Sequence, residues 1–309
     1  MYVLETNNLS KNYNGRVAVE NVNMHIEEGD IYGFVGENGA GKTTIIRLIT
    51  GLSNSSSGDY NLFGINSNSK EIYKSREKMG GIVEAVSLSL SMTAKENIEL
   101  ESLLVNKKLS DAEKDNLLLR VGLDPASIDK KKVSSFSLGM RQRLGIAITL
   151  ISNPKFIVLD EPMNGLDPKG FIEIRDVILK LNSEGITFLI SSHILSELDR
   201  ICNKIGFISH GRLLKELSIE ELHSASKPRI IIDAVNISNI EETLKKELNL
   251  LDTKIENNIL NIYDDIDINE IIKSLVSNNI KVNNISKIEE TIETYYMKLI
   301  GGILKWRIS

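Results

Sequence analysis

The sequence has one cysteine, Cys202, no long apolar run and no excess of positive charge. A lone cysteine cannot form an intrachain disulfide, so we expect a reducing compartment. No apolar run approaches the ~20 residues that a membrane-spanning helix needs, and the first residues lack the basic-then-apolar layout of a signal peptide. The net charge of -5 gives no support for a nucleic-acid partner, and we expect none. If the protein works at a membrane, another chain must span it.

The most informative stretch is a glycine-rich turn between the apolar strand predicted at 31–35 and a helix that closes near Gly51. Residues 36–43 read GENGAGKT and fit G-x-x-x-x-G-K-[ST]. Glycines let consecutive backbone N–H groups surround a phosphate, and the following helix adds its positive N-terminal dipole. The alternative is an ordinary glycine turn. The residues predicted to hold nucleotide phosphates are Gly36, Asn38, Gly39, Ala40, Gly41, Lys42, Thr43 and Thr44.

A second constellation follows a buried-type strand. Residues 156–159 are apolar and are followed directly by Asp160 and Glu161. Asp160 and the Thr43 hydroxyl are suited to hold Mg²⁺, and Glu161 is placed to orient or deprotonate a water molecule. Ligands of open α/β sheets bind at the carboxyl ends of strands, where this acidic pair and the glycine loop both fall. The pattern therefore predicts a Mg²⁺-dependent phosphate-transfer site.

The 309 residues leave room for one large domain and one small domain. In the first, residues 79–84 read as a strand ending in Glu84, and apolar spacing predicts helix between Thr93 and Arg120 with a start at Ser110. The character changes past residue 215, so we expect domains at 1–215 and 216–309. Strands are predicted at 229–235, 254–263 and 280–288, and helices at 239–248, 268–278 and 289–300. This alternation indicates a small α+β accessory domain, ferredoxin-like in type.

Over about residues 2–215 the chain resembles an ATP-binding subunit of an ABC transporter. Residues 136–140 resemble that family's signature, Leu-Ser-Gly-Gly-Gln. Ser137 and Gly139 match it, whereas Phe136, Leu138 and Met140 depart from it. Residues 164–167 resemble the D-loop, which ends in Asp167. Ser191-Ser192-His193, after a predicted strand, resembles the switch-histidine segment.

Tyr13 falls where the family carries the aromatic residue that stacks on adenine. A flat ring offers a π-face to a base, although a tyrosine before the Asn14–Gly15 turn can also be purely structural. At Glu84 the family usually has glutamine, in a loop that touches Mg²⁺ or the attacking water and faces the membrane partner. The alternative is that Glu84 is an ordinary surface residue. The glutamate, the degenerate signature and the sequence after His193 resemble exporter ATPases for bacitracin and lantibiotics.

The resemblance implies an α/β P-loop cassette with a RecA-like core, an antiparallel β subdomain and a helical subdomain. Two copies would sandwich two ATP molecules, each between the glycine loop of one copy and Ser137 and Gly139 of the other, and Asp167 would be a further nucleotide-binding residue. Glu161 would be the general base, His193 would position the γ-phosphate, and Glu84 would address Mg²⁺. The chain would be a cytoplasmic motor on the inner face of the cell membrane, coupled to separate membrane-spanning permease subunits.

Three other functions remain to be weighed. The cassette could serve a transporter for another substrate. A soluble translation factor of the superfamily usually carries two cassettes, whereas this chain has one phosphate loop. A DNA-repair ATPase would need a long coiled coil between the glycine loop and the signature, and residues 84–136 show no sustained heptads.

Overall fold

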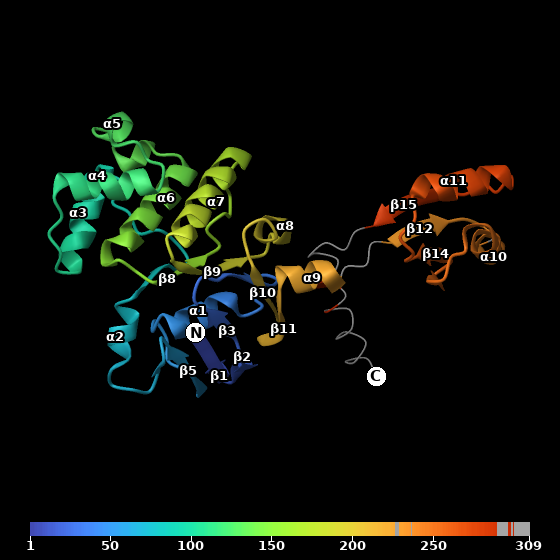
Figure 1. Ribbon diagram of the computed structural model, residues 1–309. Helices are drawn as coiled ribbons and strands as arrows, with labels where there is room; N and C mark the ends of the chain where they lie inside the picture. Colours follow the sequence, from blue (N-terminus) through green and yellow to red (C-terminus); the bar gives the residue numbers. More distant parts are fainter. Residues whose placement is uncertain (226–228, 236, 289–295, 298, 300–309) are drawn as a thin grey trace. The chain divides into compact units, whose positions relative to one another are not determined.

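The chain folds as two compact units, Met1–Ile219 and Glu220–Ser309 (Figure 1). The computed structural model describes residues 1–225, 229–235, 237–288, 296–297 and 299. The predicted boundary after residue 215 falls inside strand β11 (Arg212–Ser218), which pairs with the central sheet of the first unit. None of the described helices is long and apolar enough to cross a lipid bilayer.

An antiparallel sheet carries the N-terminal part of the first unit. Its strand order is β2-β1-β5-β6, and β3 also pairs with β1. The strands are β1 (Tyr2–Tyr13), β2 (Arg16–Val22), β3 (His25–Glu27), β5 (Ser57–Leu62) and β6 (Ile65–Asn66). The predicted turn at Asn14–Gly15 joins β1 to β2, with φ of 49° and 89°, as a type I′ hairpin requires. This turn places Tyr13 directly opposite Arg16.

A second, mainly parallel sheet forms the centre of the unit, in the order β11-β10-β4-β9-β8-β7. Besides β11, its strands are β4 (Ile31–Val35), β7 (Met79–Ile82), β8 (Phe156–Asp160), β9 (Thr187–Ser192) and β10 (Lys204–Ser209). Every residue of β4, β8 and β9 is buried, as in parallel sheets covered on both faces. Because these strands are parallel, the loops after β4, β8 and β9 meet at one edge of the sheet.

Strand β7 is shorter than predicted. It ends at Ile82, because the Ala85 N–H donates to the Val83 carbonyl and Glu84 takes a left-handed φ of 66°. Glu84 therefore lies in the loop beyond the strand instead of at its tip.

Helix α1 (Lys42–Ile49) packs between the two sheets. Its Ile45, Ile46, Leu48 and Ile49 side chains are buried in one apolar core with residues of β1, β4 and β8. The packing of both sheets on this helix fixes the position of its first residue, Lys42, at the end of β4.

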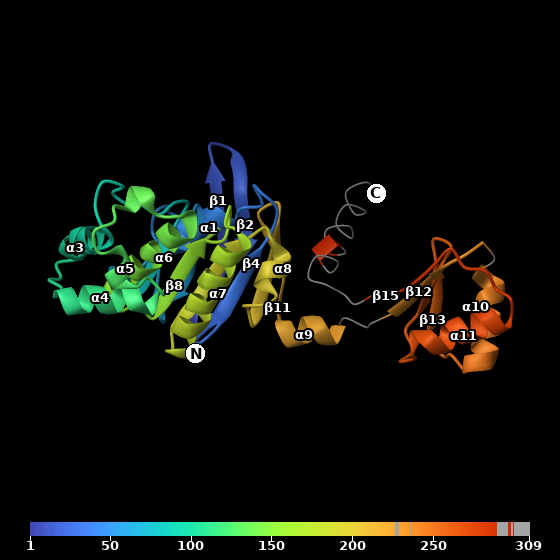
Figure 2. The same ribbon diagram turned by 90° about the horizontal axis from the view of Figure 1, so that it is seen from above.

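The remaining helices of the first unit lie mostly on one side, where α3, α4, α5 and α6 gather away from the antiparallel sheet (Figures 1 and 2). The helices are α2 (Ile72–Arg76), α3 (Ala94–Leu104), α4 (Asp111–Arg120), α5 (Pro125–Ile128), α6 (Leu138–Thr149), α7 (Pro168–Ser183) and α8 (Leu195–Leu198), and short 3₁₀ turns lie at Val133–Ser135 and Leu150–Ser152. At the predicted helix start, Ser110 accepts a hydrogen bond from the Glu113 N–H, and the Ser110 N–H donates to the Glu113 carboxylate. The predicted helical stretch is thus two capped helices.

The second unit has the βαββαβ order of a ferredoxin-like motif. After α9 (Ile219–Ala225), its elements are β12 (Arg229–Asp233), α10 (Ile237–Leu248), β13 (Thr253–Glu256), β14 (Ile259–Ile262), α11 (Ile268–Ser277) and β15 (Asn284–Ile288). The sheet order is β13-β14-β12-β15, with all neighbours antiparallel. The single strand predicted at 254–263 was wrong: Asn257 and Asn258, with φ of 49° and 61°, turn the chain into a hairpin. The helix predicted at 289–300 falls largely outside the described residues.

Candidate nucleotide-binding site

The loop after β4 closes around Lys42. The Lys42 Nζ donates hydrogen bonds to the carbonyl oxygens of Gly36 at 2.6 Å and Glu37 at 3.2 Å. It also lies 3.3 Å from the Glu161 Oε1. Only 5% of Lys42 is exposed, and a buried ammonium group needs such partners because it has lost most of its water.

Two glycines of the motif are required by the space around them. A Cβ at Gly36 would lie 2.5 Å from the Ile208 carbonyl oxygen, closer than any real contact. Gly41 has a φ of 110°, and a Cβ there would lie 2.9 Å from the Ala18 carbonyl oxygen. Larger residues would push the loop away from β2 and β10, so these glycines set the path of the backbone beside Lys42.

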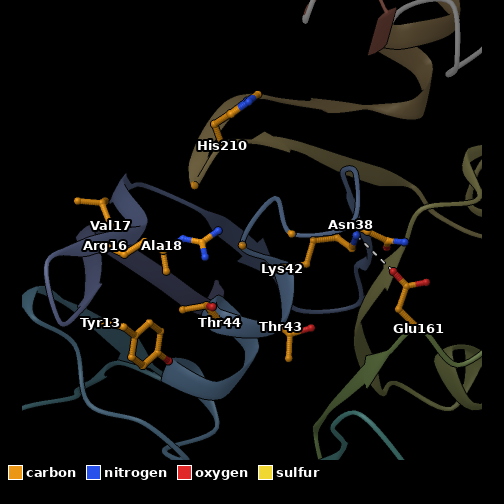
Figure 3. A pocket seen from close by; sticks show the side chains of 13 residues that line it. Tyr13, Arg16, Val17, Ala18, Asn38, Lys42, Thr43, Thr44, Glu161 and His210 are labelled. Atoms are coloured by element: carbon orange, nitrogen blue, oxygen red, sulfur yellow. Dashed lines mark ion pairs between the residues drawn. The ribbon is translucent and has the colours of Figure 1, made fainter.

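A cavity of about 580 Å³ opens beside this loop (Figure 3). Its size is in the range of about 300–1,000 Å³ that is usual for small-molecule pockets. The predicted residues that line it are Tyr13, Asn38, Gly39, Gly41, Lys42, Thr43, Thr44 and Glu161. Gly36 and Ala40 belong to the loop but do not line the cavity.

Thr43 and Asp160 form a cluster of oxygen ligands at one end of the loop. The Thr43 hydroxyl donates to Asp160 Oδ2 at 2.9 Å, and the Ser191 hydroxyl donates to Asp160 Oδ1 at 2.6 Å. The described residues contain no group of three or more His, Cys, Asp or Glu side chains that could hold a metal ion by themselves. A carboxylate and a hydroxyl fit Mg²⁺, which commonly takes one or two protein ligands and completes its shell with phosphates and water.

Glu161 sits between Lys42 and His193. Its Oε2 lies 2.7 Å from the His193 Nδ1, while its Oε1 faces Lys42. Glu161 has a φ of 51°, and its N–H donates to the backbone carbonyl and the side-chain hydroxyl of Ser191 at 3.2 and 3.0 Å. The structure thus brings together three of the residues expected to act on the γ-phosphate and its water.

Three further titratable groups have raised pKa values, each mainly through burial. Burial raises the pKa of Glu197 on α8. The charge of His193 acts in the opposite direction, and the charge of Glu161 raises the pKa by a smaller amount. Burial also raises the pKa of Cys202 and of Tyr32, and Tyr32 donates to Glu216 at 2.9 Å. None of the three lines the nucleotide cavity.

Tyr13 presents its ring to the far end of the cavity. The Lys11 Nζ lies 5.0 Å from the centre of the ring and donates to the Asn54 carbonyl oxygen. Lys11 does not line the cavity, whereas Tyr13 does and is 42% exposed. The lysine therefore supports the ring and leaves it accessible from the cavity.

Glu84 lies outside this cavity. Its Oε1 makes an ion pair of 2.7 Å with the Arg47 Nη2 of helix α1, and both side chains are about half exposed. The pair connects the loop after β7 to the helix that begins with Lys42. The carboxylate is therefore paired with Arg47 in this structure.

Ser137, Gly139 and Asp167 line a separate cavity of about 500 Å³. The Ser137 hydroxyl caps α6 by accepting from the Met140 N–H at 3.2 Å, and Asp167 caps α7 by accepting from the Gly170 N–H at 3.0 Å. The N-termini of both helices thus border one hollow. The structure does not bring these three residues to the glycine loop of their own chain.

Sequence reasoning missed five cavity residues: Arg16, Val17, Ala18, His210 and Gly211. The first three begin β2, and the last two turn the chain between β10 and β11. Gly211 connects strand β2 to the glycine loop. Its N–H donates to the carbonyl of Ala40 in that loop, and its carbonyl accepts from the N–H of Glu20 in β2, both at 2.8 Å. The Asn14–Gly15 and His210–Gly211 turns were visible signals, but their approach to the loop depends on strand pairing.

Comparison with known proteins agrees with this geometry. Residues 19–164 match the family model described as ABC transporter. The chain is 38% identical to the bacitracin transport ATP-binding protein BcrA of Bacillus licheniformis, over 97% of this chain and 98% of the relative. It is 42% identical to the lantibiotic transport ATP-binding protein SrtF of Streptococcus pyogenes, over 69% of this chain and 90% of the relative.

Among solved structures, a dimeric ATP-binding cassette bound to ADP and phosphate has a TM-score of 0.62 and 26% identity. The match covers 70% of this chain and 98% of that cassette. The predicted cassette fold, with an additional α+β unit, is confirmed. The chain belongs to the ABC transporter family, as one of its ATP-binding proteins, and it is an ATPase.

Proposed function

We propose that this chain is the ATP-hydrolysing subunit of an exporter of antimicrobial peptides of the bacitracin kind. The observation that carries the hydrolytic part is the contact chain Lys42–Glu161–His193, with Lys42 and His193 on the two oxygens of one carboxylate. Lys42 and Glu161 line the nucleotide cavity, and His193 contacts it through Glu161. ATP hydrolysis needs a cation that can move from a carboxylate to a phosphate. It also needs a carboxylate that can then accept a proton from water.

The hydrolysis step follows from these positions. ATP would place its phosphates against the loop amides and Lys42, and its base against Tyr13. When Lys42 moves to the phosphate oxygens, Glu161 is released to accept a proton from water. The water oxygen then bonds to the γ-phosphorus, the bond to the bridging oxygen breaks, and ADP and phosphate result. His193 holds the other oxygen of Glu161 and would position the γ-phosphate.

Thr43 and Asp160 would hold Mg²⁺, which when bound would supply positive charge to stabilise the phosphates. Glu84 would join this site only after leaving Arg47, so its role near the metal requires a movement of the loop after β7. We propose that Arg47 and the metal site compete for the Glu84 carboxylate.

The cavity lined by Ser137, Gly139 and Asp167 supports a paired arrangement of two copies. Ser137, Gly139 and Asp167 border a hollow with two helix N-termini but lie apart from the glycine loop of their own chain. In the proposed sandwich they would contact the ATP of the second copy. The dimeric cassette with ADP and phosphate supports this arrangement.

The substrate class rests on similarity along the whole chain. The bacitracin relative matches 97% of this chain and therefore includes the ferredoxin-like unit, whereas the lantibiotic relative matches 69%. The accessory unit thus favours a bacitracin-type exporter. We propose that a separate permease spans the membrane and that this chain binds to its inner face.

A growth test can examine this function. The chain is expressed together with candidate permease subunits from its own genome in a sensitive bacterium, which is then exposed to bacitracin, to a lantibiotic or to an unrelated antibiotic. We expect resistance to bacitracin that disappears when Glu161→Gln replaces the natural chain. Equal resistance with the variant, or resistance to none of the compounds, would contradict the proposal.

A further inference from the structure

Arg16 is a cation that lines the nucleotide cavity and takes part in none of the contacts described above. It is the first residue of β2 and lies opposite Tyr13 across the Asn14–Gly15 turn. Arg16 lines the cavity together with Tyr13, Thr44 and Lys42. Figure 3 shows its guanidinium directed into the space between Tyr13 and Lys42.

The other basic groups near this cavity are engaged. Lys42 contacts Glu161 and two carbonyl oxygens, and the His210 Nδ1 shares a hydrogen bond of 2.8 Å with the Ser209 hydroxyl. Arg212, just beyond Gly211, is paired with Glu20 at 2.8 Å. In the part of the chain that the structure describes, the Arg16 guanidinium has neither a carboxylate partner nor a side-chain hydrogen bond.

The position of Arg16 along the cavity selects the part of the nucleotide that it can reach. With the base on Tyr13 and the terminal phosphates at Lys42, the middle of the cavity receives the ribose and the α-phosphate. Of these two groups only the α-phosphate carries charge. A guanidinium offers parallel N–H donors that match phosphate oxygens, and it stays charged at every physiological pH.

We propose that Arg16 binds the α-phosphate of the nucleotide. The inference rests on the proposed placement of ATP in this cavity. A contact to the α-phosphate stabilises ATP and ADP equally, so it holds the nucleotide through hydrolysis without favouring substrate over product. Its contribution to affinity is the same whichever base the nucleotide carries. Arg16 is thus a binding residue and takes no part in bond breaking.

The test compares nucleotide affinities of the natural protein, Arg16→Gln and Arg16→Lys by titration calorimetry with ATP, ADP and GTP. Arg212→Gln is the matched control, because it removes the same charge from a residue next to the cavity that does not line it. We expect Arg16→Gln to weaken ATP and ADP binding by the same factor, about ten-fold, the scale of a charge-assisted hydrogen bond at an accessible site. Arg16→Lys should lose less, since it keeps the charge but not the fork.

Further readouts separate a phosphate contact from its rivals. Affinity should fall less steeply with salt in Arg16→Gln than in Arg212→Gln, while the ratio of ATP to GTP affinity stays unchanged. A changed ratio would place Arg16 on the base, and a loss for ATP that clearly exceeds the loss for ADP would place it on the terminal phosphate; either result overturns the inference. Affinities within about a factor of two of the control would also overturn it. If the natural protein binds nucleotide in the same titrations, the proposed placement of ATP in this cavity still stands. If the natural protein bound no nucleotide, both proposals would fall.

Discussion

Glu161→Gln is the substitution that tests the proposed chemistry most directly. The side chain keeps its size and can still accept one hydrogen bond, but it loses its charge and its basicity. Its carboxylate lies 2.7 Å from the His193 Nδ1 and 3.3 Å from the Lys42 Nζ. If Glu161 takes the proton of the attacking water, the turnover number should fall by about 10² or more, the scale of losing a general base.

The same change should strengthen ATP binding, because ATP must draw Lys42 away from Glu161. Coulomb's law at 3.3 Å, with an effective dielectric constant of about 20, gives an attraction of about 5 kcal/mol. Desolvation of the two charges offsets most of it, so we expect a net contribution of about 1 kcal/mol. Without the carboxylate, ATP should therefore bind about five-fold more tightly.

The assay pairs phosphate release with ATP titration, both on the protein assembled with its permease. Glu20→Gln is the control, since it makes the same chemical change in the Glu20–Arg212 ion pair, and Glu20 does not line the cavity. Slower phosphate release with tighter ATP binding is expected only for Glu161→Gln. Near-normal phosphate release from that variant would refute the assignment of Glu161 as the base.

Three other predictions follow from the same contacts. Lys42→Ala should weaken ATP binding at least ~10-fold, because a charge-assisted contact to phosphate is lost; an unchanged dissociation constant in titration would contradict its role. The Glu161→Gln protein should form a dimer with ATP and Mg²⁺ and return to monomer with ADP, and Ser137→Ala should weaken that dimer; light scattering that gives one mass in every state would count against the sandwich. Glu84→Gln should raise the Mg²⁺ concentration for half-maximal hydrolysis, and Arg47→Gln, which frees Glu84, should lower it; an unaltered requirement in both would place Glu84 outside the metal's surroundings.

Local sequence was sufficient for the parts of the site whose shape is set by neighbours along the chain. The apolar run before Asp160 indicated a buried strand, and the spacing of Gly36 and Gly41 indicated a loop that only glycine allows at those two positions. Both features reflect sterics and burial within a few residues.

Contacts between distant segments were not predictable in this way. Arg16 reaches the cavity because β1 and β2 form a hairpin, and His210 does so because β10 lies beside β4. The partner of Glu84, Arg47, lies on another element, and nothing in the pattern around either residue selects the other. In contrast, the hairpin at Asn257–Asn258 had a local signal, since asparagine tolerates a left-handed backbone better than most residues.

The backbone at Glu161 explains how two adjacent carboxylates can have different tasks. In an extended strand, neighbouring side chains point to opposite faces, so Glu161 would turn away from the side of Asp160. Instead Glu161 takes a left-handed φ of 51°, a conformation that costs a non-glycine residue about 1 kcal/mol or more. Ser191 stabilises it: its carbonyl and hydroxyl oxygens accept from the Glu161 N–H, and the same hydroxyl donates to Asp160. One serine of β9 therefore directs Asp160 toward Thr43 while it holds Glu161 toward Lys42 and His193. Because His193 follows Ser191 by two residues, any shift of the end of β9 must move the proposed base and its histidine together.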